Sequence, residues 1–437
     1  MNTPATVPAG QAAGGDQTTR RGWATVGALA VTQTVGYGTL YYAFAVFLTP
    51  LAADLHTSTT AVTGAFTTSI LTGALLAIPV GRWLDHHGGR GLMTAGSLAG
   101  VLLLIAWAHA HSLWQLYAIQ VGIGAASAAS LYEAAFAVII AWFTADRRAT
   151  ALLALTVVAG FASTIFLPLT GWLVDRHGWR TGVLALAAIQ TVTVPLHALL
   201  VRRPTHRPPT GAKRPAASGA VRTALADPGF WLLALGFTAH TAAISALTVH
   251  LVAALVSLRH PPAVAATIAG LLGVLSVTGR LVTTGLQRRY PITTITAAVF
   301  AVQAGAAALL PVVGRTVLGA IGAVVGFGFG FGVATIARPV LLADRYDSRR
   351  YATLAGILVV PITLPTATAP LAAAALHTTT DSYTPVLTAI AVCCALAAVG
   401  IGLVGTRPVT RLPPSRPRGG LSPVWTSKPG SGSRGGP

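Results

Sequence analysis

Long apolar runs alternate with short polar segments along nearly the whole chain. Each run holds at least 20 residues, which is about the length that an α-helix needs to cross the hydrocarbon core of a bilayer. The runs span residues 22–50, 58–80, 91–110, 113–143, 149–172, 180–200, 228–256, 262–285, 292–313, 316–337, 352–377 and 383–405. The pattern therefore predicts twelve transmembrane helices, some of them long enough to tilt or to extend past the membrane.

Composition agrees with helices in lipid rather than with a soluble fold. Of the 437 residues, 53% are hydrophobic and only 9% are charged, whereas soluble proteins carry about 25% charged residues. The runs are rich in Ala, Gly, Ser and Thr, which let helix backbones approach closely in a membrane. Open β-sheet edges do not cross hydrocarbon, because their backbone groups would stay unpaired. We therefore expect an all-α membrane protein.

One charged turn occurs twice. Residues 81–90 read GRWLDHHGGR and residues 171–180 read GWLVDRHGWR, with Gly, Asp, His, Gly and Arg at the same five of ten positions. The first copy joins the second and third runs, and the second copy joins the fifth and sixth. A shift of three runs reverses the direction of crossing, so the copies lie on opposite faces of the membrane. This is typical of an inverted three-helix repeat nested within a six-helix half.

The polar segments divide the chain into two six-helix halves. The N-terminal half covers residues 22–201, the C-terminal half covers 228–405, and a cytosolic linker rich in Pro, Gly and basic residues covers 202–227. Such a linker has little capacity to pack. The end segments 1–21 and 406–437 are predicted to be cytosolic, and the second is predicted to be disordered. The strings ADRRATALLAL and DSRRYATLAGI open the fifth and eleventh runs, which indicates that the halves are parallel repeats.

The basic residues predict the orientation. The formal net charge is +19, which in a soluble chain would suggest a nucleic-acid partner. Here the basic residues lie between apolar runs, so no nucleic acid is expected. With both termini in the cytosol, the only Lys or Arg residues on the outer face are Arg176, Arg180, Arg259 and Arg315, as the positive-inside rule requires. We expect a multi-pass protein of the cell (inner) membrane, with its basic ends against anionic lipid.

The repeated turn carries a family resemblance. Gly81, Asp85, Gly88 and Arg90 match the major facilitator superfamily signature between the second and third helices, Gly-x-x-x-Asp-(Arg/Lys)-x-Gly-(Arg/Lys)-(Arg/Lys). The residue after Asp85 and the one before Arg90 depart from it, being His and Gly. The strings GYGTLYYAFAVFLTPL, GWLVDRHGWR and LADPGFWLLALGF are similar to the monocarboxylate and oxalate–formate branch of that family.

This resemblance implies a gating role for the turn. Glycines let the two helices meet in a tight bend, and the Asp85 carboxylate is favoured at a helix N-terminus. In the resembled family this Asp helps to lock one access state, so Asp85 is expected to face the start of the run at 352–377, with Arg90 neutralising it. Together with Gly81 and Gly88 they form the predicted gate. The alternative is a solvated turn that only fixes the topology.

Two charged residues are predicted well inside the runs, where a charge is costly. Glu133 lies in the fourth run and Arg280 in the eighth. The resemblance implies that Arg280 binds a substrate carboxylate, for which a guanidinium is suited. The second cation that relatives use is missing from the first and eleventh runs. The alternative is that Arg280 pairs with Glu133 or with backbone carbonyls and holds the halves together.

Glu133 is the predicted proton-coupling residue, because a carboxyl group in a low-dielectric site can bind and release a proton near neutral pH. The alternative is a structural, neutral or ion-paired carboxyl group. Tyr37 and Tyr41 share a helix face and are predicted to contact the solute, or else to pack between helices. His240 and His250 can relay protons, although a hydrogen bond to a neighbouring helix is the favoured role.

The sequence thus predicts a secondary active transporter that moves a small organic solute, in particular a carboxylate, by alternating access coupled to protons. Its partners are the solute, protons and the lipid bilayer. It predicts no enzyme, cofactor or metal, since it contains no nucleotide-binding loop and no catalytic cluster, and the adjacent Cys393 and Cys394 indicate neither a disulfide nor a metal site. The alternatives are an uncoupled exchanger, a drug or metabolite exporter of the same fold, a non-transporting sensor that uses the linker, or a membrane enzyme.

Overall fold

The computed structural model describes residues 9–202, 217–346 and 350–406, and within these ranges it is built of helices and turns without strands. Eleven continuous helical segments are long and apolar enough to cross a membrane. One of them, Ala145–Leu200, has 56 residues, or about 84 Å of helix, against a hydrocarbon core of about 30 Å. The backbone of Gly178 is non-helical near its middle, with φ 77° and ψ 164°. The segment therefore holds two crossings, and the all-α, twelve-helix prediction is confirmed.

The N-terminal half is built from α1 (Ala9–Tyr37), the π-helix η1 (Gly38–Tyr42), α2 (Phe44–Asp54), α3 (Thr59–His87), α4 (Gly89–Ala108), α5 (Leu113–Ser130), α6 (Tyr132–Trp142), α7 (Ala145–Ala159), α8 (Ala162–Gln190) and α9 (Thr193–Leu200). Several predicted spans therefore consist of two helices in series. A membrane protein tolerates such breaks where they are buried in protein or line a cavity.

The C-terminal half follows the short helix α10 (Ala217–Ala226) and contains α11 (Pro228–Ser257), α12 (Pro262–Leu286), α13 (Ile292–Val313), α14 (Val317–Gly328), α15 (Val333–Arg345), α16 (Tyr351–Thr380) and α17 (Thr384–Thr406). Here only the tenth span is divided, into α14 and α15. Helix α11 begins where Asp227 accepts a hydrogen bond from the Gly229 N–H and Pro228 occupies the first turn, a favourable N-terminal pattern.

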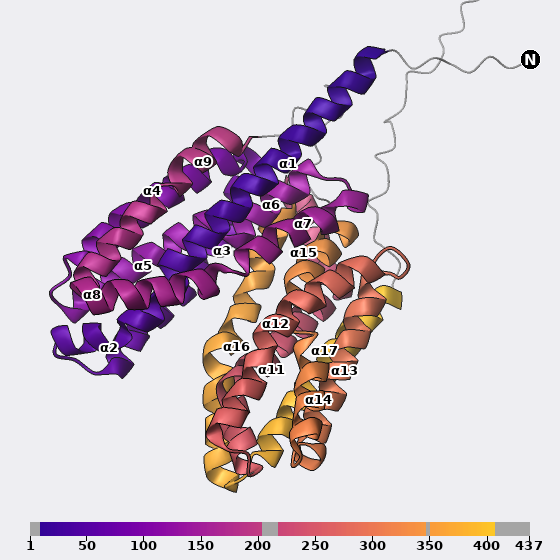
Figure 1. Ribbon diagram of the computed structural model, residues 1–437. Coiled ribbons are helices and arrows are strands. Elements are labelled where there is room, and N and C mark those ends of the chain that lie inside the picture. The colour runs from indigo at the N-terminus through magenta and orange to yellow at the C-terminus, as the bar shows by residue number, and fades with distance from the viewer. Residues whose placement is uncertain (1–8, 203–216, 347–349, 407–437) are drawn as a thin grey trace, which may run out of the picture.

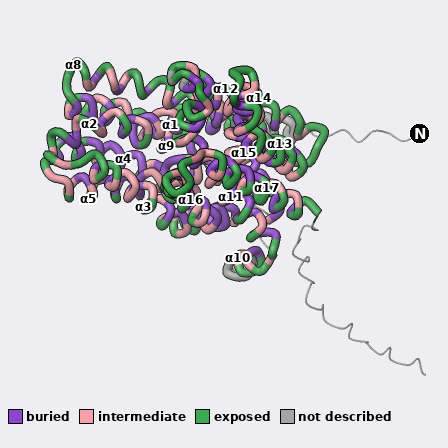
Figure 2. The backbone as a smooth tube through the Cα atoms, turned by 90° about the horizontal axis from the view of Figure 1, so that it is seen from below, coloured by how far each residue is buried: buried purple, intermediate pink, exposed green. Residues whose placement is uncertain are grey.

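The two halves meet at one end of the molecule and diverge toward the other (Figure 1). We call the first the linker end, where α9 ends and α11 begins, and the second the far end. A hydrophobic cluster joins the halves at the linker end and includes Leu84, Leu152, Val340 and Leu354. Two further clusters each belong to one half only. Figure 2 shows buried residues among the helices of both halves.

Two boundaries differ from the sequence prediction. Helix α1 begins at Ala9 rather than near residue 22, so the predicted end segment is largely helical. Part of the predicted linker also folds, because α10 buries Ala224 in the cluster that joins the halves. The remaining linker residues 203–216 and the tail from 407 lie outside the described residues, and so does the disorder predicted for that tail.

Candidate gate and transport pathway between the halves

The first copy of the repeated turn is docked on the other half. The Asp85 carboxylate accepts hydrogen bonds from the backbone N–H groups of Ala352 (3.1 Å) and Thr353 (2.9 Å), and from the Thr353 hydroxyl. These N–H groups belong to the first turn of α16, where an anion is favoured. Asp85 therefore faces the start of α16, as the resemblance implied, and its gating role stays a prediction.

Glycine makes this contact possible. A Cβ on Gly81 would lie 2.1 Å from the Ala352 carbonyl oxygen, and one on Gly356 would lie 2.2 Å from the Ala77 oxygen. The backbones of α3 and α16 therefore touch at two glycines. Gly88 joins α3 to α4 with φ 78°, a conformation that glycine adopts without strain.

Arg90 does not neutralise Asp85, so that prediction is wrong. Its Nε donates a hydrogen bond of 2.6 Å to the Ala198 carbonyl oxygen, because the first turn of α4 lies beside the last turn of α9. The last carbonyls of a helix attract cations. The cation that acts on Asp85 is Arg350, whose Nη1 also lies 3.2 Å from Nε2 of His86.

Two ion pairs join the halves next to this contact. Arg148 of α7 donates to Asp344 of α15 at 2.9 Å, and only 8% of the Arg148 side chain is exposed. Arg338 of α15 donates to Glu133 of α6, with 21% and 26% of the two side chains exposed. The structure thus pairs Glu133 with Arg338, and the alternative pairing with Arg280 is wrong.

Arg338 is a site residue that the sequence analysis missed. The predicted tenth span, 316–337, ends one position before it. Helix α15 instead continues through Pro339 to Arg345. The apolar string PVLLA after Arg338 is the signal that places this arginine inside a span. Arg338 is therefore a further interior charge that the sequence analysis did not count beside Glu133 and Arg280.

Arg280 also joins the halves, through a backbone carbonyl. Its Nη1 donates to the Thr156 oxygen of α7 at 2.8 Å, as the alternative interpretation expected. Its Nε is buried and has no partner among the described residues. Gly332 leaves room for the aliphatic part of the Arg280 side chain, since a Cβ at Gly332 would lie 2.8 Å from Cγ of Arg280. Arg280 thus keeps one donor free beside the junction of the halves.

Tyrosines gather near this arginine. The ring centroids of Tyr37 and Tyr41 are 6.0 Å apart, and Tyr132 lies 4.5 Å from Tyr37. The π-helical turn of η1 adds Tyr42, whose ring is 5.3 Å from that of Tyr41. Tyr42 and Tyr132 both interact electrostatically with Arg280. The sequence pattern found the first two tyrosines, but it did not show the turn or the α6 break that adds the others.

The predicted histidines are bonded to neighbouring helices. His240 Nε2 lies 3.1 Å from the Gln303 side-chain oxygen, and His250 Nε2 lies 3.0 Å from the Pro370 carbonyl oxygen. Cys393 and Cys394 are free thiols. Among the described residues no group of three or more His, Cys, Asp or Glu side chains is placed to hold a metal ion.

A second polar cluster lies at the linker end of the C-terminal half. Asp227 accepts hydrogen bonds from Arg345 (3.0 Å) and from the Tyr346 hydroxyl (2.8 Å). A Cβ on Gly229 would lie 2.6 Å from the Arg345 guanidinium, so the Asp-Pro-Gly string both caps α11 and makes room for this arginine. Burial raises the pKa of Asp227, but the hydrogen bonds from Gly229, Arg345 and Tyr346 outweigh it and hold the pKa below its usual value.

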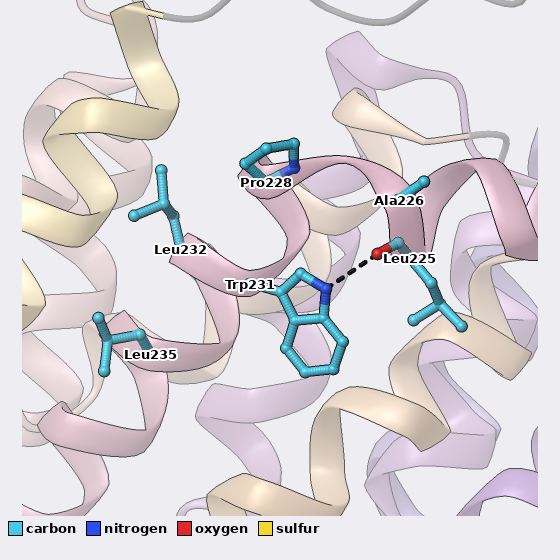
Figure 3. A pocket seen from close by; sticks show the side chains of 6 residues that line it. All are labelled: Leu225, Ala226, Pro228, Trp231, Leu232 and Leu235. Carbon is cyan, nitrogen blue, oxygen red and sulfur yellow. Dashed lines mark hydrogen bonds between the residues drawn. The ribbon is translucent and has the colours of Figure 1, made fainter.

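An apolar groove of about 450 Å³ lies beside this cluster (Figure 3). Its walls are Leu225, Ala226, Pro228, Trp231, Leu232 and Leu235. The Trp231 indole N–H donates to the Leu225 carbonyl oxygen at 2.9 Å, so the groove walls present no free charged group. It shares no residue with the ion pairs between the halves, and we do not assign it to the pathway.

Twelve helical crossings in two halves, with ion pairs joining the halves at one end, define a membrane transporter rather than an enzyme. Residues 30–370 match the model of the Major Facilitator Superfamily, which is most of the chain. The protein therefore belongs to that family.

The family contains relatives with several cargoes. An efflux pump of Mycolicibacterium smegmatis is 30% identical over 238 residues, which cover 52% of this chain and 53% of the pump. The match thus spans about half the length of this curated relative. The chain can also be superposed on the Escherichia coli fucose:proton symporter with a TM-score of 0.69 and 13% identity, over 86% of this chain and 98% of the symporter.

Two further solved structures share the fold. A bacterial homologue of the iron transporter ferroportin in the outward-facing state gives a TM-score of 0.70 at 16% identity, over 89% of this chain and 100% of that one. The human organic anion transporter MFSD10 gives 0.65 at 15% identity, over 88% and 99%. At these identities the likeness shows the fold alone.

Proposed function

We propose that this transporter moves a small organic solute, in particular a carboxylate, by alternating access coupled to protons. The observation that carries the proposal is the Glu133–Arg338 ion pair, which bridges the two halves and stays partly exposed. A carboxylate that is ion-paired with the opposite half stabilises their contact. Protonation removes its charge, so proton binding and separation of the halves are linked.

The orientation of the molecule is part of the proposal. Of the described basic residues, those at the far end are Arg176, Arg180, Arg259 and Arg315, and the others lie at the linker end or within the bundle. The positive-inside rule then favours a cytosolic linker end, a cell-membrane location and cytosolic termini. Since the halves diverge at the far end, the arrangement described here corresponds to a state open to the outside.

Arg280 and Arg338 supply two guanidinium groups for an anionic solute. Arg280 has a free Nε donor, and a solute carboxylate can replace Glu133 on Arg338. Both groups suit the planar geometry of a carboxylate. Arg338 in the tenth span thus serves as the second cation, which is missing from the first and eleventh spans. Tyr37 and Tyr41 pack against Tyr132 and Tyr42, the two tyrosines that interact with Arg280, and extend this aromatic surface. These contacts support the monocarboxylate and oxalate–formate resemblance.

The second candidate is export of a drug or metabolite. It is favoured by the 30% identity to a mycobacterial efflux pump. The two candidates share the fold and the ion pairs but differ in the solute and in the direction of net movement.

Transport in proteoliposomes tests the proposal. The protein should accumulate a radiolabelled monocarboxylate such as lactate when a pH gradient is imposed, and much less without it. Glu133→Gln should abolish the effect of the gradient while solute exchange continues, and Arg280→Lys should weaken solute binding because lysine lacks the planar fork. Asp381→Asn, at an exposed turn, is the matched control. Transport that ignores both the gradient and Glu133→Gln would exclude proton coupling, and export of a dye without lactate uptake would favour the efflux candidate.

A further inference from the structure

The second copy of the repeated turn has the backbone geometry of the first, and Arg180 donates to the Ala110 carbonyl oxygen as Arg90 does to that of Ala198, but the aspartate of the second copy is not docked. Gly88 has φ 78° and ψ 176°, and Gly178 has φ 77° and ψ 164°. Asp85 is docked on α16, whereas Asp175 is exposed and forms no hydrogen bond or ion pair with the described part of the chain. A Cβ on Gly171 would meet no atom within 4 Å. The aspartate of the turn is therefore docked on the other half at the linker end and exposed at the far end.

The surface on which the first copy docks is also repeated. Residues 352–358 of α16 read ATLAGIL, and residues 266–272 of α12 read ATIAGLL. Helices α12 and α16 form the eighth and eleventh spans, which are three apart and therefore cross the membrane in opposite directions. The two turns follow the second and fifth spans, which are also three apart. The inverted repeat of the N-terminal half thus carries the turn twice, and the inverted repeat of the C-terminal half carries the docking surface twice.

The residues of α16 that hold the first turn have counterparts in α12. Thr353, which donates to Asp85, corresponds to Thr267, and Gly356 corresponds to Gly270. The Thr267 hydroxyl now donates to a carbonyl oxygen of its own helix at 2.8 Å, and a Cβ on Gly270 would meet no atom within 4 Å. Thr267 and Gly270 are therefore exposed and not covered by another helix, and Asp175 is exposed too.

The positions of the helices fit this pairing. Figure 2 shows α8 and α12 along one side of the molecule and α3 and α16 along the other. Helix α7, which continues into α8, already touches α12 where Arg280 donates to Thr156. Beyond that contact α8 and α12 diverge toward the far end (Figure 1).

We propose that the Asp175 turn docks on α12 when the halves close at the far end, as the Asp85 turn docks on α16 at the linker end. The Asp175 carboxylate accepts a hydrogen bond from the Thr267 hydroxyl, and Gly171 and Gly270 form the close helix crossing. Thr267 is the sixth residue of α12, which begins at Pro262, so its hydroxyl, rather than the N–H groups of the first turn, is the donor for Asp175. The two docked states exclude each other, and each contact stabilises one of them. The inference rests on the alternation that the proposed function requires.

Leucine at the two far-end glycines tests the crossing. Gly171→Leu and Gly270→Leu place side chains in space that is open in the present arrangement, so both variants should fold and keep the thermal midpoint of the unsubstituted protein. Each should lower transport by about tenfold or more, because the added side chain blocks the close approach. Gly305→Leu, on α13, is the control, since a Cβ there also meets no atom within 4 Å. Transport by all three variants at the same rate would overturn the proposal.

A distance measurement reads the states without any solute. Spin labels at Arg176→Cys and Ala263→Cys, with Cys393 and Cys394 replaced by Ala, report the separation of the turn from α12. The protein should show a long and a short distance, and both leucine variants should lose the short one. Asp175→Asn and Thr267→Val should reduce the short population. If the short distance persists in the leucine variants, or is absent without them, the docking is wrong. Two distances without lactate or dye transport would instead exclude the proposed function and leave the docking intact.

Discussion

At the scale of single residues, two pairs of opposite charges join the halves across the seam. Glu133 and Arg338 belong to different halves, and so do Arg148 and Asp344. Removing one partner of a buried ion pair is strongly destabilising, because the other charge is left unpaired. Replacing both partners by neutral residues is tolerated better. The two members of a pair should therefore depend on each other energetically.

We predict that Arg338→Leu lowers the free energy of unfolding by about 1–3 kcal/mol, because it leaves the Glu133 carboxylate unpaired in a partly buried site. Adding Glu133→Gln should restore most of that loss. Thermal unfolding of the two single variants and the double variant in detergent measures this coupling. Additive effects of the two changes would show that the ion pair contributes no stability.

Asp227 gives a pH-dependent prediction outside the membrane-spanning segments. Its pKa is lower in the folded protein than in the unfolded chain, so its contribution to stability is complete above about pH 4 and is lost as the pH falls through the lowered folded value. Asp227→Asn keeps a cap for α11 but removes the negative charge that pairs with Arg345, at a cost of about 1–3 kcal/mol. Thermal midpoints between pH 3 and pH 7 should converge for the two proteins at the acidic end. Parallel curves would contradict this assignment.

At the scale of helices, the seam depends on the crossing of α3 and α16. Gly81 and Gly356 bring the two backbones into contact, and the Asp85 carboxylate then reaches the first turn of α16. A larger residue at either glycine separates the helices and removes these hydrogen bonds.

We predict that Gly356→Ala shifts the protein away from the arrangement described here, because its Cβ would lie 2.2 Å from the Ala77 oxygen. A cysteine introduced at Thr353, which is buried under Asp85, should react faster with a maleimide in this variant. Gly285→Ala, in α12, is the control because a Cβ there meets no atom within 4 Å. Equal labelling rates in the two variants would show that the crossing does not require glycine.

The helices and the repeat could be predicted from the sequence, because both depend on local patterns. Hydrophobic length determines a span, and the duplicated turn indicates the symmetry. The partner of Glu133 could not be predicted, since Arg338 lies 205 positions away and the pairing depends on how the halves pack. Arg338 lies one position beyond the predicted tenth span and was therefore not counted as an interior charge. Arg90 was misassigned because only the fold shows that α9 ends beside it.

At the scale of the whole molecule, one hydrophobic cluster and a set of polar contacts join the halves at the linker end, while the far ends are held apart. Alternating access then requires these contacts to break as a group. Joining the halves covalently at that end should stop the cycle without unfolding the protein.

We predict that a reducible bifunctional thiol reagent, applied to His86→Cys with Arg350→Cys in a protein without Cys393 and Cys394, abolishes transport. The native side chains at these positions lie 3.2 Å apart, so the reagent can bridge them in the present arrangement. Reduction should restore the rate, and His86→Cys alone should be insensitive to the reagent. Continued transport by the bridged protein would mean that the linker end does not open.

The free Nε–H of Arg280 has a consequence for the empty carrier. A buried donor without an acceptor raises the free energy of the molecule by about 1–3 kcal/mol, and an arriving oxygen atom relieves that cost at once. If a solute places an oxygen atom at this N–H, as proposed, the loaded protein gains that free energy relative to the empty one. A hydrocarbon of the same size would leave this N–H without an acceptor, so we expect the carrier to prefer solutes that present an oxygen atom.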